Sequence, residues 1–223
     1  AGTVNTDSGW PISLGSNAPF LVVVSPDNSF AYVMSAGLVP GGSYVSKVNL
    51  ASPGAPSIVG SYPAASTPSA GTFNANGSEL MVTNGNGTLT FINTATNSII
   101  STIASGQPEF NNAIKMPNGL VYATDTSTST VVVIDLSTRS VIKSFSTCDG
   151  GAYSLLNLQA DPNNSGEFYV YCSSPQPSFE VRSLSTDAIT RGFNVTYAGF
   201  GSDISPDGQN IIAPRFGDNF IDI

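Results

Sequence analysis

The sequence predicts an all-β protein, a β-propeller of five four-stranded blades, because two features of the chain repeat. A polar turn followed by an apolar strand occurs five times, with the turns at 25–28, 74–77, 116–119, 161–164 and 205–208. An Asn, Asp or Ser then marks the end of the next strand, at Asn49, Asn93, Asp135, Ser183 and Asp222. The repeat length is roughly 40 to 50 residues, which is typical of a propeller blade.

The repeats divide residues 1–223 into blades of one domain. Four blades are complete in sequence, at about 18–63, 64–106, 107–149 and 150–195. The fifth covers 196–223 and lacks a fourth strand, so we expect residues 1–17 to complete it. Such a ring leaves no open sheet edge. Two alternatives remain, a segment of a longer array and an N-terminal strand donated to a neighbouring subunit.

Equal spacing at the two ends of the chain supports closure by the N-terminal strand. Trp10 precedes Pro19 by the same number of residues by which Ile99 precedes Pro108 at the end of the second repeat. We therefore expect residues around 10–14 to pair with residues around 219–223 as the outer strand of the fifth blade.

The strand after each turn has a recurring core of four residues. Residues 81–84 read Met-Val-Thr-Asn, residues 122–125 read Tyr-Ala-Thr-Asp, and residues 88–100 continue through a strand, a turn and another strand. These segments resemble the repeat of YVTN-type β-propellers, a family of surface-layer and secreted repeat proteins. The other repeats keep the pattern with different letters, as Cys172 and Pro214 show. The resemblance implies a scaffold and supplies no catalytic residues, because fold alone does not specify function.

Composition excludes several partners. Charged residues make up 10% of the chain and hydrophobic residues 40%, and the net charge is −8. The seven basic residues are scattered, so we expect no binding to nucleic acid or to anionic membrane surfaces. No apolar run reaches about 18 residues, so we expect no membrane insertion. The start at Ala1 fits a mature chain whose signal peptide has been removed, although an excised fragment would look the same.

Two cysteines and three sequons point outside the cell. Cys148 and Cys172 permit one disulfide, with two buried free thiols as the alternative. The sequons begin at Asn76, Asn86 and Asn194, in expected turns or blade edges where a glycan would face solvent. The expected location is therefore extracellular or on the cell surface.

The absence of histidine narrows the chemistry. Ser-His-Asp and Cys-His catalysis and His-ligated zinc are excluded. A carboxylate pair facing a sugar remains an option for glycoside hydrolysis. The candidate ligand-binding residues lie in loops that join blades or join second to third strands: Glu109, Asn111, Asp125, Asp149, Asp203, Arg215 and Asp218. Their structural interpretation is that Asp and Asn cap turns.

Calcium and aromatic residues give two weaker signals. Residues 161–167 resemble the start of a calcium loop, but Cys172 occupies the twelfth position, where a Glu is required. We therefore predict no cofactor and no metal, with calcium at this loop as the alternative.

Tyr32, Tyr122, Tyr169 and Phe168 are expected in the core. Aromatic residues outside these strand positions are candidates for stacking on sugars: Tyr44, Tyr62, Phe110, Tyr153, Tyr197 and Phe200.

We therefore predict a secreted or cell-surface propeller that acts as a non-catalytic binding or structural module. Its expected partners are glycans or neighbouring surface proteins, and self-assembly is an option. The alternatives are a carboxylate- or metal-dependent hydrolase, such as a glycosidase or a lactonase-like enzyme, and a subunit of a surface layer or filament.

Overall fold

The computed structural model describes residues 12–14, 17–37, 43–50, 56–151, 155–163, 166–173, 178–195, 202–208, 210–214 and 221–222. Antiparallel strands dominate this part of the chain, together with a short 3-10 helix, η1 (Cys148–Gly150). The chain divides into two compact units between Ala104 and Ser105, and each unit is described by itself.

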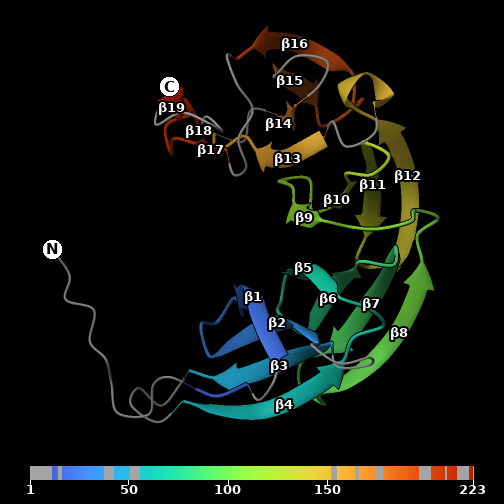
Figure 1. Cartoon of the computed structure of the whole chain (residues 1–223), viewed down its shortest axis with the longest axis vertical. Helices are drawn as coiled ribbons and strands as arrows, with labels where there is room; N and C mark the ends of the chain where they lie inside the picture. The colour runs from blue at the N-terminus through green and yellow to red at the C-terminus, as the bar shows by residue number, and fades with distance from the viewer. Residues whose placement is uncertain are drawn as a thin grey trace, which may run out of the picture. The chain divides into compact units, whose positions relative to one another are not determined.

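Unit 1 contains two four-stranded antiparallel sheets, each connected in sequence order (Figure 1). Sheet 1 consists of β1 (Asn17–Val24), β2 (Phe30–Gly37), β3 (Tyr44–Asn49) and β4 (Ser57–Pro63). Sheet 2 consists of β5 (Pro68–Phe73), β6 (Glu79–Asn84), β7 (Thr88–Asn93) and β8 (Ser98–Ala104).

Unit 2 repeats this plan and adds a shorter sheet. Sheet 3 consists of β9 (Asn112–Lys115), β10 (Val121–Asp125), β11 (Thr130–Asp135) and β12 (Ser140–Ser146). Sheet 4 consists of β13 (Leu155–Ala160), β14 (Glu167–Cys172), β15 (Ser178–Ser183) and β16 (Ile189–Asn194). Sheet 5 consists of β17 (Asp203–Ile204), β18 (Ile211–Pro214) and β19 (Ile221–Asp222).

In sheets 2 and 3, burial distinguishes the two middle strands from the fourth strand. Every residue of β6 and of β10 is buried, whereas most residues of β8 are exposed. A strand covered on both faces needs continuous apolar sequence, and a strand with one wet face alternates. The apolar cores recognised in the sequence are therefore the strands that lie within each sheet.

The turns follow from local side-chain chemistry. In the β1–β2 turn, the Asp27 carboxylate accepts hydrogen bonds from the Ser25 hydroxyl (2.6 Å) and the Ser29 backbone N–H (3.1 Å), and Asn28 has a positive φ of 58°. The turns between third and fourth strands place Asn97 and Asp187 at φ of 56° and 58°. Asn and Asp tolerate this left-handed conformation better than most residues.

Each unit has its core between neighbouring sheets. In unit 1 it includes Tyr32, Met34, Phe73 and Leu80, and the rings of Tyr32 and Phe73 meet edge to face at 5.4 Å. In unit 2 it contains Tyr122, Phe168, both cysteines and residues packed around them. The expectation that Tyr32, Tyr122, Tyr169 and Phe168 belong to the core is confirmed, because all four are buried.

The prediction of an all-β fold built from four-stranded antiparallel sheets is confirmed. Ring closure stays a prediction, because most of the segments concerned, including Trp10 and residues 215–220, lie outside the described residues. Ile12 and Leu14 are described, are not part of a strand, and pack against Ala31, Val33 and Val48 of sheet 1.

Candidate functional site

Three of the predicted ligand-binding residues meet at the turn that joins β10 to β11. The Asn111 side-chain oxygen accepts hydrogen bonds from the backbone N–H (3.0 Å) and the hydroxyl (2.7 Å) of Thr126. The same hydroxyl lies 3.5 Å from the Glu109 carboxylate. Asp125 is fully buried, and its Oδ1 accepts from the backbone N–H (2.9 Å) and the hydroxyl (2.5 Å) of Ser127. These contacts stabilise the turn itself.

The other candidates do not join this group through any described contact. Asp149 is exposed within η1, and exposed Asp203 accepts a hydrogen bond from the backbone N–H of Ile204 (2.8 Å). Arg215 and Asp218 lie outside the described residues. For the described candidates that form hydrogen bonds, the capping interpretation accounts for the contacts they make.

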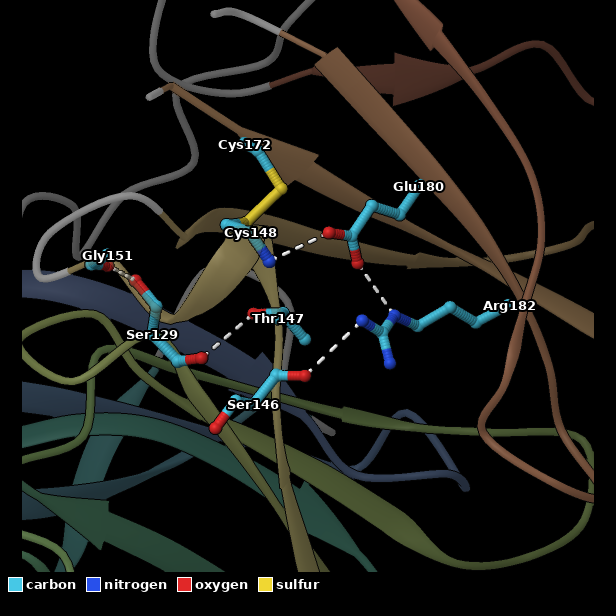
Figure 2. Close-up of a disulfide and its surroundings, with 8 residues drawn as sticks. All are labelled: Ser129, Ser146, Thr147, Cys148, Gly151, Cys172, Glu180 and Arg182. Atoms are coloured by element: carbon cyan, nitrogen blue, oxygen red, sulfur yellow. Dashed lines mark hydrogen bonds and ion pairs between the residues drawn. A yellow bond between two sulfur atoms is a disulfide. The ribbon is translucent and has the colours of Figure 1, made fainter. Parts of the chain in front are cut away.

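The predicted disulfide between Cys148 and Cys172 is confirmed. It links η1, which follows β12, to the end of β14, with a Cα–Cα distance of 5.4 Å (Figure 2). The cross-link therefore joins sheets 3 and 4. Thr147 supports the adjacent backbone, because its hydroxyl donates to the carbonyl of Ser129 (3.0 Å).

A buried ion pair lies beside the disulfide. Figure 2 shows Glu180 between Cys148 and Arg182, with one carboxylate oxygen directed to each. Glu180 accepts hydrogen bonds from the Cys148 backbone N–H (2.7 Å) and from Arg182 Nε (2.7 Å). The sulfur atoms and a Glu180 oxygen lie within 4.8 Å of one another, which is close enough to bind a metal. The sulfurs are bonded to each other, however, and thiolates are the form that ligates metals.

The calcium-like segment forms an ordinary turn in its described part. Asp161 Oδ1 accepts a hydrogen bond from the backbone N–H of Asn163 (2.7 Å), and the Asn163 amide donates to the carbonyl of Asp207 (2.8 Å). Cys172 stands where a calcium loop has its bidentate Glu, and its sulfur is bonded to Cys148.

The three sequon asparagines are exposed. Asn76 accepts hydrogen bonds from Ser78, and Asn86 accepts from the Thr88 hydroxyl (2.7 Å), within their turns. Glycosylation at Asn76, Asn86 and Asn194 stays a prediction.

The proposed sugar-stacking role is wrong for Tyr62 and Phe110, which are 3% and 1% exposed. Tyr153, Tyr197 and Phe200 lie outside the described residues, and Tyr44 is half-buried.

Two cavities lie at the turns that join first to second strands. In unit 1, a cavity of about 360 Å³ is formed by the β1–β2 and β5–β6 turns together with β3 and the β7–β8 turn. In unit 2, a cavity of about 570 Å³ is formed by the β9–β10 and β13–β14 turns and the β15–β16 turn. Asp125 lies at the opposite end of β10, so the group formed by Glu109, Asn111 and Asp125 lies at the end of the strands away from the unit 2 cavity.

The cavity of unit 1 is lined by one buried, positively charged side chain, that of Lys47. Lys47 is 5% exposed, and its Nζ donates to the Thr94 carbonyl (2.6 Å) and to Asn97 Oδ1 (3.1 Å). The same Nζ stands 3.9 Å from the centre of the Phe30 ring, a cation–π contact. Burial lowers the pKa of Lys47, and the nearby Asp27 carboxylate acts in the opposite direction. Hydrogen bonds from Ser25 and Ser29 hold the pKa of Asp27 below its usual value.

Sequence reasoning missed Lys47, although one signal was present. Lys47 occupies the position before the last apolar residue of a third strand, where the other four-stranded sheets have Phe91, Val133 and Val181. A charged residue at a buried position of a repeat indicates a local requirement for charge.

The chain was compared with protein-family models, with curated proteins and with solved structures. No protein-family model matches it, and no curated protein matches it in sequence. A solved structure, Kuenenia stuttgartiensis hydrazine synthase, is similar, with a TM-score of 0.73 and 16% identity. The match covers 95% of this chain and 58% of that chain, so this chain spans less than two thirds of it.

The similarity and the four-stranded meander sheets define the class: an all-β protein with a propeller-like fold. At this level of identity the likeness concerns the fold alone. Among the described residues, there is no helix with the length and apolarity that crossing a bilayer requires.

Proposed function

We propose that this protein is a secreted or cell-surface binding module, without catalytic activity, that recognises glycans or neighbouring surface proteins. Its fold is a five-bladed propeller of the YVTN type, closed by the N-terminal strand, and its sequons carry glycans. The loops of a rigid ring present the binding groups.

One observation supports binding over catalysis. The carboxylate and amide groups of Asn111 and Asp125, predicted as site residues, make hydrogen bonds that hold their own turn. A glycosidase needs two carboxylates on either side of the substrate, at roughly 5 to 10 Å from each other. Turn-holding carboxylates are poorly placed for that role, because leaving the turn would break the bonds that position them.

The test combines binding with turnover. The purified, disulfide-bonded protein is applied to a glycan array and incubated with chromogenic glycosides and lactones, with and without calcium. We expect binding to a subset of glycans and no hydrolysis. Hydrolysis that disappears in Glu109→Gln or Asp125→Asn would overturn the proposal in favour of the hydrolase.

Closure and location need separate measurements. A cysteine pair placed at positions 12 and 221, in the background of the native disulfide, should cross-link within one chain if the ring closes. Cross-links between chains would favour strand donation. Mass spectrometry of native material should find glycan on at least one of Asn76, Asn86 and Asn194, and three bare asparagines would argue against secretion.

A further inference from the structure

The disulfide and a neighbouring carboxylate bring three potential metal ligands together. Both sulfur atoms of the bridge and an oxygen of Glu180 lie within 4.8 Å of one another, and no other group of three thiol or carboxylate side chains in the described part of the chain is placed in this way. Cys148 and Cys172 are 3% and 1% exposed, and the Glu180 side chain is 12% exposed. The three donor atoms therefore lie in a place that excludes most water.

Hydrogen bonds hold Glu180 in this position. Its carboxylate accepts from Arg182 Nε (2.7 Å) and from the Cys148 backbone N–H (2.7 Å). Arg182 is anchored in turn, because it donates to the carbonyls of Asp187 (3.0 Å) and Ser146 (3.3 Å). The two bonds to Glu180 use one acceptor site on each carboxylate oxygen, and a carboxylate offers about four such sites. Glu180 can therefore bind a metal while Arg182 continues to hold it, as is common for metal ligands.

Reduction of the bridge turns the two sulfurs into ligands. A dithiol breaks the S–S bond, each cysteine sulfur gains one electron and one proton, and the dithiol leaves as a disulfide. A divalent metal then displaces one proton from each thiol and binds the two thiolates. The oxidised chain lacks this site, because its sulfurs are bonded to each other.

The ligands and charges of the cluster favour zinc. Two thiolates and Glu180 carry three negative charges, and a divalent metal together with Arg182 supplies three positive ones, so the buried group is neutral as a whole. Sulfur ligands favour zinc over magnesium and calcium, which prefer oxygen. Zinc binds four ligands tetrahedrally, so three ligands from the protein leave one position open.

We propose that the reduced chain binds one zinc ion through the sulfurs of Cys148 and Cys172 and a carboxylate oxygen of Glu180. The cysteine pair then has two states, a disulfide in an oxidising environment and a zinc site in a reducing one. Either state links η1 to β14, and therefore sheet 3 to sheet 4. This role is independent of the proposed recognition of glycans or surface proteins.

The experiment uses the full chain, reduced with a tertiary phosphine. The phosphine takes the oxygen of one water molecule while the two hydrogens of that water go to the cysteine sulfurs, and it is removed under nitrogen before metal is added. Zn²⁺ binding is measured by competition with a chromophoric chelator, and Co²⁺ serves as a spectroscopic probe of thiolate ligands.

Glu180→Gln is the key variant. Glu167→Gln is the matched control, because it changes another carboxylate of sheet 4 that is paired with an arginine, Arg191. The oxidised natural chain and the double variant Cys148→Ser and Cys172→Ser are the controls without thiolates.

Zn²⁺ should bind the reduced chain one to one and raise its urea midpoint, because the folded chain holds the three ligands together and the unfolded chain does not. Co²⁺ should give the intense absorption of a tetrahedral thiolate complex. Glu180→Gln should weaken Zn²⁺ binding by about tenfold or more, and Glu167→Gln should leave it unchanged. The two controls without thiolates should show neither the Co²⁺ absorption nor the shift in midpoint.

Three results would overturn the proposal. Equal Zn²⁺ affinity in Glu180→Gln and the natural chain would remove the carboxylate from the site. Binding of the same strength to the oxidised chain would place the metal elsewhere. If reduction unfolds the chain, Zn²⁺ should restore the β-sheet circular dichroism, and failure to restore it would refute the site. If reduced Glu180→Gln does not fold, Glu180→Asp replaces it under the same criterion.

Discussion

The hydroxyl of Tyr122 donates a hydrogen bond of 3.2 Å to the carboxylate of Asp187, which lies 65 residues further along the chain. The same carboxylate forms an ion pair with Lys143. In unit 1 the corresponding turn residue is Asn97, which accepts from Lys47 and Tyr62. The two units thus use one backbone arrangement with a charged acceptor in one and a neutral acceptor in the other.

Exchanging these acceptors should move stability in opposite directions. Asn97→Asp gives buried Lys47 a charged partner and should raise the free energy of unfolding by about 1 kcal/mol. Asp187→Asn removes the charge that pairs with Lys143 and should lower it by about 1 kcal/mol, since Lys143 is partly exposed. Urea unfolding at low and high salt measures both changes. Equal effects of the same sign would contradict this account.

Loss of the disulfide should destabilise the chain by about 3 kcal/mol, because the cross-link spans 24 residues and restricts the unfolded state. The double variant Cys148→Ala and Cys172→Ala tests this by urea unfolding. Reduction of the natural protein is the control and should give a similar loss. A change below about 1 kcal/mol would show that the bridge does little for unfolding equilibrium.

Arg182→Lys should lower the free energy of unfolding by about 2 kcal/mol. Arg182 is buried, binds Glu180, and donates to the carbonyls of Asp187 (3.0 Å) and Ser146 (3.3 Å). A lysine retains the charge but lacks the planar fork that reaches these acceptors. Arg191→Lys, at the more exposed pair with Glu167, is the control and should change stability by less than about 0.5 kcal/mol.

Stability should fall in alkaline solution. Burial raises the pKa of Tyr62 and of Tyr122 to about 12, from an ordinary value of 10.0. Below pH 10 both states keep these protons. Between about pH 10 and 12 the unfolded state loses them first, so each tyrosine lowers stability by about 1.4 kcal/mol per pH unit.

Urea unfolding from pH 9 to 11.5 measures this slope. Tyr62→Phe should make the fall less steep, whatever its effect at neutral pH. The same slope in the variant and in the natural protein would exclude Tyr62 as a contributor.

The sequence by itself determined the all-β class, the positions of the turns and which strands are buried. These properties depend on short-range rules, because alternation sets the faces of a strand and Asn, Asp and Gly set the turns. The meeting of Cys148 with Cys172 was also predictable, since the repeat places both beside neighbouring sheets.

Only the tertiary structure decided which polar groups meet between sheets. Lys47 contacts Asn97 across 50 residues of chain. Tyr32, expected as ordinary core, carries a buried hydroxyl for which the described residues supply no hydrogen-bond partner. A repeat pattern gives each position its burial but does not state whether its partner in the next sheet is Asn97 or Asp187. The chemistry of each junction depends on that partner, because a buried polar group is stabilised only by the group that lies opposite it.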